Sequence, residues 1–297
     1  MHYPRFTAAA ALLAAAGFVG CSVKEQPKAT DTTAAPAVTA AAQTAPTTVH
    51  IITKDYSFDA PAQISAGLTT LHLMNQGKEI HQAQLIKLTD GKTFDDFMTA
   101  LKAMKPNTPP PTWVVMEGGP NAAAPGGTSE TTQLLAAGNY VLICFIPAAD
   151  GVPHAMKGMV RGLVVAPSTA PPAAEPTATA TMTLSDYKFD LPTPLKSGQN
   201  VIRIENAADQ PHEAVIFKLA PGKTQKDFEA WLPSSATMTK PPPGMPMGGV
   251  AGLSKGEHAT VTANLDAGDY VLVCFLEDAK DGKPHFMHGM VQGFKIP

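Results

Sequence analysis

The feature that most constrains the fold is an internal duplication. Residues 55–97 and 186–228 align with an offset of 131 residues, which places His81 over His212. The offset stays close to this value in the segments that follow and returns to 131 near the end of each copy. A unit of about 115 residues has the size of a small domain and is far longer than a solenoid repeat. We therefore expect two copies of one domain.

Each copy is predicted to consist mainly of strands. The chain holds 28 prolines and 24 glycines, which favours turns over long helices. Residues 69–75 and 81–88 alternate in polarity, and a glycine precedes a run of branched residues at 138–145. A Thr-x-x-Asp pattern beginning at Thr93 predicts one helix. The second copy repeats all of these signals, so we expect two β-sandwiches, each with one short inserted helix.

Both copies carry the same set of potential metal ligands. A histidine at the start of one strand is followed, much later in the chain, by a cysteine at the end of another strand, a second histidine and a methionine. Two imidazoles, a thiolate and a weak thioether are donors that suit copper in both oxidation states. The residues are His81, Cys144, His154 and Met159 in the first copy, and His212, Cys274, His285 and Met290 in the second.

These motifs resemble those of the plastocyanin-like cupredoxins. The likeness lies in Gly-x-Tyr-x-x-x-Cys, which begins at Gly138 and Gly268, and in the later Pro-His-x4-Met. It covers most of residues 47–166 and 177–297, the two expected domains, with a linker at 167–176. The resemblance implies an all-β fold of two tandem Greek-key β-sandwiches. It also implies a type 1-like copper site in each, with one or two ions bound in all, and the eight residues above as ligands.

One spacing departs from the family pattern. Nine residues separate Cys144 from His154, and ten separate Cys274 from His285, which is more than the family usually has. Closing the longer loop costs only about 1–1.5 kcal/mol, whereas structural metal sites contribute about 10 kcal/mol or more. The longer loop therefore does not forbid the site, although it is expected to alter the spectrum and the potential.

Several alternatives remain open from the sequence. Met156 is a second choice for the axial ligand of the first site, and Met287 and His288 are second choices in the second site. The fold could also serve as a metal-free interaction or scaffold module. Finally, Cys144 and Cys274 could form a disulfide if the two domains met around a two-fold axis at these edges.

The N-terminal segment predicts export and anchoring. Residues 1–21 hold one arginine and a short apolar run, as in a signal peptide. Residues 18–21 resemble the lipobox of bacterial lipoproteins, which implies lipidation of Cys21. Residues 22–46 are rich in Ala, Thr and Pro and are expected to form a disordered tether. We thus expect a protein held by lipid on the periplasmic or cell-surface side of a bacterial membrane.

Composition and motifs narrow the function further. A net charge of -3 gives no footprint for nucleic acid. No histidine flanks Cys144 or Cys274, and no His-x-His pair occurs, so the catalytic copper motifs of oxidases and nitrite reductases are missing. The sequence therefore predicts a protein that is not an enzyme and that serves in electron transfer or in copper storage or delivery. A redox partner protein is expected, and the oligomeric state stays open.

Overall fold

The computed structural model describes residues 45–104 and 109–297. The predicted signal peptide, the lipidation site Cys21 and nearly all of the predicted tether lie outside these residues. Within them, no helix is both long enough and apolar enough to cross a membrane.

The first repeat forms two sheets that pack face to face. Leucines at alternate positions of the strands, such as Leu71, Leu73, Leu85 and Leu142, point between the sheets and form one core. One sheet has the order β2 (Ser57–Asp59), β1 (Thr47–Lys54), β4 (Gly67–Asn75) and β7 (Thr128–Leu135). The other has the order β3 (Gln63–Ser65), β9 (Val160–Ala166), β8 (Gly138–Ile143), β5 (Gln84–Leu88) and β6 (Val114–Met116).

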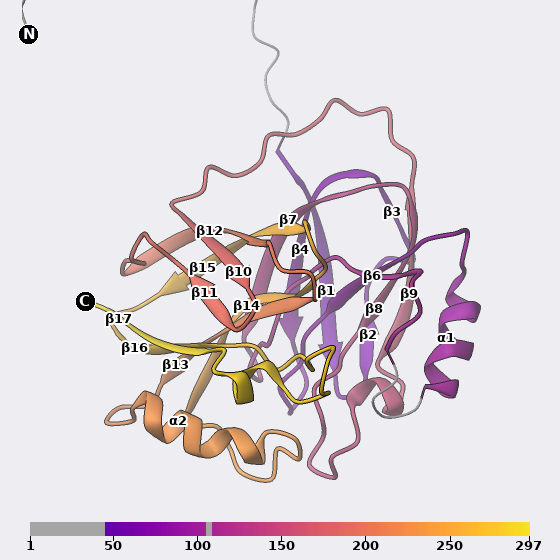
Figure 1. The fold of residues 1–297 in the computed structure, drawn as a ribbon. Helices are drawn as coiled ribbons and strands as arrows, with labels where there is room; N and C mark the ends of the chain where they lie inside the picture. The colour runs from indigo at the N-terminus through magenta and orange to yellow at the C-terminus, as the bar shows by residue number, and fades with distance from the viewer. Residues whose placement is uncertain (1–44, 105–108) are drawn as a thin grey trace, which may run out of the picture. The chain divides into compact units, whose positions relative to one another are not determined.

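The second repeat copies this plan (Figure 1). Its core is formed by residues such as Ile202, Ile204, Ile216 and Leu272, which are all fully buried. One sheet has the order β11 (Lys188–Asp190), β10 (Ala180–Ser185), β12 (Gly198–Asn206) and β15 (His258–Leu265). The other has the order β14 (Gly244–Leu253), β13 (His212–Leu219), β16 (Gly268–Val273) and β17 (Val291–Ile296). Residues 167–179, between β9 and β10, form no strand or helix.

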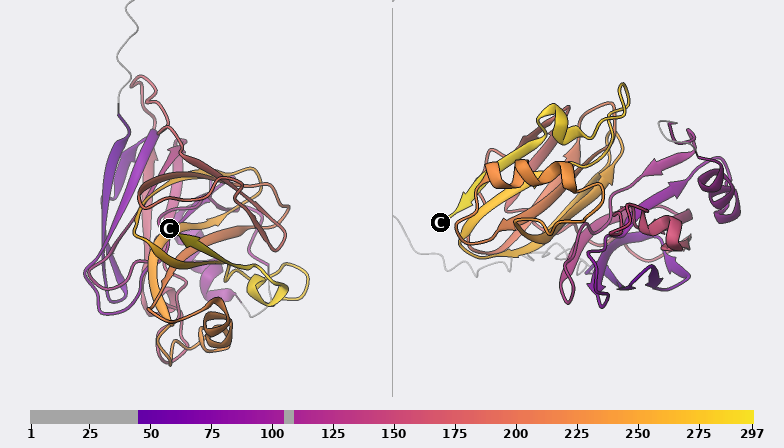
Figure 2. Two further views of the ribbon diagram at one scale, coloured as in Figure 1. Left: turned by 90° about the vertical axis from the view of Figure 1, so that its left-hand side faces the viewer. Right: turned by 90° about the horizontal axis from the view of Figure 1, so that it is seen from below.

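One α-helix lies in each repeat, as predicted. These are α1 (Phe94–Ala103) and α2 (Gln225–Trp231). Thr93 accepts a hydrogen bond from the Asp96 amide and donates its own amide to the Asp96 carboxylate, and Thr224 and Asp227 do the same. Such capping boxes satisfy donors that the first turn leaves unpaired. Helix α2 packs over β16 and β17 (Figure 2).

The two repeats join through paired backbone in two layers. Strands β7 and β15 pair antiparallel, with Thr131 opposite Val261, so that the sheets of both repeats form one sheet of eight strands. In the second layer the segment 117–123 pairs antiparallel with 247–253, with Pro120 opposite Val250. In both layers the central pair consists of residues that correspond in the duplication. The repeats are therefore related by an approximate two-fold axis.

Candidate metal centres

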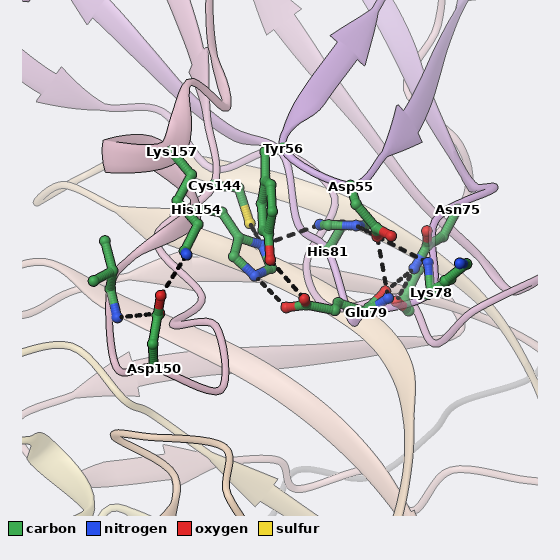
Figure 3. Close-up of polar contacts among 12 residues, drawn as sticks. Asp55, Tyr56, Asn75, Lys78, Glu79, His81, Cys144, Asp150, His154 and Lys157 are labelled. Carbon is green, nitrogen blue, oxygen red and sulfur yellow. Dashed lines mark hydrogen bonds and ion pairs between the residues drawn. The ribbon is translucent and has the colours of Figure 1, made fainter.

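The first centre forms where three distant parts of the chain meet. His81 lies three residues before the start of β5, Cys144 directly follows β8, and His154 begins the short 3-10 helix η1 (His154–Lys157). One donor atom from each lies within 4.8 Å of the others, and all three residues are fully buried. His81 Nδ1 lies 3.1 Å from His154 Nδ1, which lies 3.5 Å from Cys144 Sγ. Figure 3 shows the convergence.

The long segment between Cys144 and His154 folds back on itself. Pro147 and Pro153 are bridged in an antiparallel pair, and the His154 amide donates to the Ile146 carbonyl at 2.9 Å. The extra residues thus form a small hairpin that returns His154 to the cysteine. This explains how a loop longer than the family pattern still closes the centre.

The second centre repeats the first. His212 begins β13, Cys274 follows β16, and His285 begins η3 (His285–His288), with one donor atom from each within 4.8 Å of the others. The Cys274 Sγ lies 3.3 Å from His285 Nδ1. Its loop also returns as a hairpin, because Glu277 and Pro284 are bridged.

Hydrogen bonding fixes which imidazole nitrogen faces each cluster. His81 Nε2 lies 3.1 Å from Asp55 Oδ1, and His212 Nε2 lies 3.1 Å from Asp186 Oδ1. The proton therefore sits on Nε2, and the Nδ1 lone pair faces the other donors. The hydrogen bond from His212 holds the pKa of Asp186 below its usual value.

The donor set fits copper. His212 Nδ1 is buried and has no hydrogen-bond partner among the described residues. An unsatisfied buried nitrogen is costly unless another group satisfies it, and a metal ion would do so. Two imidazoles and a thiolate are the equatorial ligands of blue-copper sites. The predicted copper cofactor is therefore supported by the chemistry of both clusters.

Burial keeps the clusters neutral in the metal-free protein. It lowers the pKa of all four histidines, that of His285 to about 4. It also raises the pKa of the Cys144 thiol to about 12 and that of Cys274 well above its usual value. Copper must therefore displace a thiol proton when it binds, whereas the imidazoles are already deprotonated at neutral pH.

The backbone places Met159 and Met290 beside the cysteines. The Cys144 amide donates to the Met159 carbonyl at 3.2 Å, the Cys274 amide donates to that of Met290 at 3.2 Å, and both methionines are fully buried. By contrast, Met156 and Met287 are 57% and 61% exposed. His288 binds the Asp281 carboxylate at 3.2 Å. Met159 and Met290, the first choices from the sequence, are therefore buried beside the cysteines, whereas Met156 and Met287 are largely exposed.

The two centres differ at the second histidine. In the first, His154 Nε2 lies 2.9 Å from the Glu79 carboxylate, which also accepts a hydrogen bond from Tyr56 at 2.7 Å (Figure 3). In the second, Gln210 occupies the position of Glu79, and His285 Nε2 has no hydrogen-bond partner within the described ranges. The second centre has its own carboxylate nearby, because Asp278 accepts hydrogen bonds from Gln210 and from Tyr187, the counterpart of Tyr56. The centres therefore differ in whether a carboxylate contacts the second histidine directly.

The carboxylates that support the histidines are not predicted from the sequence. Asp55, Glu79 and Asp186 were not singled out, although the Asp-Tyr pair at residue 55 recurs at residue 186. The recurrence of this pair at matching positions of the two copies could have marked both aspartates as functional residues. The alternative of a disulfide is ruled out, because Cys144 and Cys274 are both free and lie in separate cores.

Comparison with solved structures returns copper proteins. A dithionite-reduced auracyanin from the photosynthetic bacterium Roseiflexus castenholzii is 24% identical, with 42% of this chain and 100% of that chain covered and a TM-score of 0.28. The "blue" copper protein auracyanin A from Chloroflexus aurantiacus is 26% identical, with 40% and 98% covered and a TM-score of 0.28. A copper-containing nitrite reductase from Thermus scotoductus is 12% identical, with 84% and 61% covered and a TM-score of 0.23. No protein-family model and no curated protein matches the chain.

The prediction that the chain is not an enzyme is wrong. The solved structures whose matches cover 84% to 86% of this chain include the nitrite reductase, a multicopper oxidase and a laccase from Botrytis aclada, which are enzymes. The prediction relied on motifs taken from such enzymes, namely a histidine beside the cysteine and His-x-His pairs. The absence of these motifs from a sequence does not exclude an enzymatic activity.

The fold and the two clusters agree with the family suggested by the sequence. Each repeat is a β-sandwich with a duplicated set of buried donors, and the predicted fold class and copper cofactor are confirmed. The described residues form two tandem β-sandwiches, each with a His, Cys and His set that suits copper, in agreement with the resemblance that the sequence shows to cupredoxins.

Proposed function

We propose that this protein is an exported, lipid-anchored copper protein with a redox centre in each domain. The ligands are His81, Cys144, His154 and Met159 in the first centre, and His212, Cys274, His285 and Met290 in the second. Copper held there supplies one-electron exchange between its cuprous and cupric states. Electron transfer is the favoured role, ahead of copper storage or delivery.

The observation that carries this proposal is the duplicated convergence of buried donors. In both repeats three donors lie within 4.8 Å of one another, although they come from residues far apart in the chain. The two repeats differ at many positions of their sequences, yet both keep these three donors, which chance alone does not explain. Buried imidazoles and a thiol cost stability unless they are satisfied, so their retention in both repeats supports a bound ion.

The protein's own residues hold the donors in place before any ion binds. Asp55 and Asp186 orient one imidazole of each centre through Nε2. The amide of Glu213 donates to Cys274 Sγ at 3.5 Å, which favours the thiolate. Complete burial of the donors excludes water from each cluster. A preorganised site of this kind changes little between oxidation states, which favours fast electron exchange.

A copper titration tests the proposal. Purified protein is loaded with cupric ion, and its visible spectrum and copper content are recorded beside those of Cys144→Ser and Cys274→Ser. An intense thiolate-to-copper band, reduced by about half in each variant, is expected. Stoichiometric copper that neither substitution affects would show that the ligand assignment is wrong. Protein that binds no copper would favour the metal-free scaffold module.

Redox behaviour separates electron transfer from delivery. A reversible potential with fast self-exchange supports a carrier, whereas slow exchange and ready loss of copper to chelators supports delivery.

The lipid anchor rests on the sequence of residues 18–21. Metabolic labelling with a radioactive fatty acid in a bacterial host, followed by membrane fractionation, tests it. We expect label on the wild-type protein, and we expect Cys21→Ser to lose both the label and the membrane association.

A further inference from the structure

A cavity of about 650 Å³ lies between the two repeats. This volume is within the range of small-molecule sites, at about 300–1,000 Å³. Both repeats contribute to its lining, among them Ile80, Phe145 and Ile146 from the first, and Phe217, Trp231 and Phe286 from the second. The cavity is distinct from the copper clusters, because none of the proposed ligands lines it.

Aromatic side chains of the second repeat form one wall. The ring of Phe275 lies 6.4 Å from Trp231, 6.5 Å from Phe217 and 5.8 Å from Phe286, measured between centroids. The Trp231 indole N–H donates to the Lys240 carbonyl at 2.9 Å, so its polar atom is already satisfied. The ring faces therefore offer apolar surface and negative quadrupoles, which attract aromatic rings and cations.

A carboxylate reaches this apolar surface. Glu213 lines the cavity and is only 4% exposed. Its Oε1 accepts a hydrogen bond from the Phe275 amide, and its Oε2 accepts one from Asn121 Nδ2, both at 2.9 Å. Asn121 is itself fully buried and also donates to the Val250 carbonyl at 2.9 Å. The carboxylate is thus held in place by both repeats.

The charged side chains that line the cavity are acidic. Glu213 and Glu277 line the cavity, and none of its lining residues is a lysine, arginine or histidine. Two neutral donors, the Phe275 amide and Asn121 Nδ2, compensate for the Glu213 carboxylate in part, and a cation would add to this stabilisation. Aromatic rings together with a carboxylate are the surroundings that an organic ammonium group prefers. Both size and charge therefore point to one class of ligand.

We propose that this cavity binds a small organic ammonium ion with an aromatic or apolar body. The ammonium group binds the Glu213 carboxylate, and the body packs against Trp231 and Phe217. This inference goes beyond the copper function and does not depend on it. The cavity nevertheless adjoins both centres, because its lining residues Phe145 and Phe275 directly follow the two cysteines.

Calorimetric titration of the full-length, metal-free protein tests the proposal. The probes are phenethylammonium chloride and its neutral counterpart 2-phenylethanol, at neutral pH. We expect the ammonium ion to bind at least ten times more tightly than the alcohol. Glu213→Gln introduces the residue type found at the corresponding Gln82 of the first repeat. It should weaken phenethylammonium binding at least tenfold and leave the alcohol nearly unaffected.

Two further variants make the result decisive. Glu229→Gln removes a carboxylate from the nearby helix α2 that does not line the cavity, so it should leave binding unchanged. Trp231→Leu should weaken both probes and serves as the test if Glu213→Gln fails to fold, as judged by its unfolding midpoint. The proposal is overturned if millimolar phenethylammonium gives no binding heat, if both probes bind equally, or if folded Glu213→Gln binds like the wild type. Because the protein is metal-free, these outcomes are independent of copper loading.

Discussion

At the residue scale, an aspartate orients one imidazole of each centre. Asp186 accepts a hydrogen bond from the Nε2–H group of His212 and so directs the Nδ1 lone pair toward Cys274 and His285. Loss of a carboxylate that orients a metal-binding histidine in this way typically lowers metal affinity by about 10- to 100-fold. Asp186→Ala is therefore expected to weaken copper binding at the second centre by a factor in this range.

Competition with a chelator measures this effect. The Cys144→Ser background leaves only the second centre to be titrated. Asp190→Ala, at an exposed position of β11, is the matched control and should have no effect. Equal affinities for Asp186→Ala and the control would show that Asp186 does not position the ligand.

Glu79 places a carboxylate directly against the second histidine of the first centre, a contact that His285 of the second centre lacks among the described residues. Its carboxylate contacts His154 Nε2 at 2.9 Å and is 35% exposed, so solvent weakens but does not remove its effect. A negative charge near the ion favours the cupric state. Glu79→Gln, which copies Gln210 of the second repeat, should therefore raise the reduction potential of the first centre, by roughly 40 mV.

Potentiometric titration of the first centre alone, in a Cys274→Ser background, measures the shift. A potential that stays the same or falls would contradict the proposed role of Glu79.

The buried histidines predict how the metal-free protein responds to pH. The pKa of His285 is about 4 in the folded protein, against an ordinary value of 6.5, and the other three histidine pKa values are also lowered. Between these values the unfolded chain binds more protons than the folded one, so stability falls as pH falls through this window. Burial raises the pKa of Glu117 and Glu213, which acts in the opposite sense.

We expect the four histidines to outweigh the two glutamates. Chemical denaturation should show a net loss of roughly 2 kcal/mol between pH 7 and pH 5 in the metal-free protein. Stability that is constant or increases over this interval would contradict the neutral, buried state of the histidines.

The sequence pointed to the residues proposed as metal ligands, but not to the carboxylates that form hydrogen bonds with the histidines. The ligand residues stand out because the same residue types recur at matching positions in both copies. Asp55 and Glu79 form hydrogen bonds with histidines 26 and 75 residues away. The periodicity of apolar residues along the sequence does not reveal such a pair, because its members come into contact only when the folded chain brings β1 close to β5.

At the element scale, local rules predicted the helices well. The Thr-x-x-Asp pattern correctly marked the start of both helices, because a capping box involves only residues three apart. The strands were predicted from their alternation for the same reason. The hairpin between each cysteine and histidine was not, because its bridge depends on how the loop packs.

The capping box of α2 offers a stability test. Thr224→Ala removes the acceptor of the Asp227 amide and should lower the free energy of unfolding by about 1 kcal/mol. For a protein of this size the melting temperature should fall by about 2–4 °C. Differential scanning calorimetry measures the change, with Thr181→Ala at an exposed position as the control. A shift no larger than that of the control would show that the cap contributes little.

At the scale of the whole molecule, the strand pairing that joins the two repeats was not predictable from the sequence. Thr131 and Thr132 follow the polar pattern of a solvated edge strand, yet both are buried where β7 meets β15. Pairing between edges depends on backbone groups that every residue carries, so it leaves no compositional trace. The duplication predicted two domains, whereas the structure joins them through a shared sheet.

Buried polar groups tie the stability of one repeat to that of the other. The fully buried Gln84 side chain donates to the Gly252 carbonyl at 2.9 Å, and that of Asn121 donates to the Val250 carbonyl at 2.9 Å. If the second repeat unfolded alone, the Asn121 amide would lose both of its acceptors, Glu213 and Val250, whereas Gln84 would lose one of three. The cost is about 1–3 kcal/mol for each group that stays unsatisfied. Unfolding of the second repeat would also leave the edge of β7 without its partner strand, which would add to this free-energy cost.

Both repeats should therefore unfold in a single transition. Calorimetry of the metal-free protein is expected to give one peak whose van't Hoff and calorimetric enthalpies agree. Ala251→Pro removes the amide that donates to the Gly119 carbonyl across the joint and should split the peak in two. Two separate peaks in the wild-type protein would instead mean that the repeats are independent domains. The approximate two-fold joint would then contribute little to the folded state.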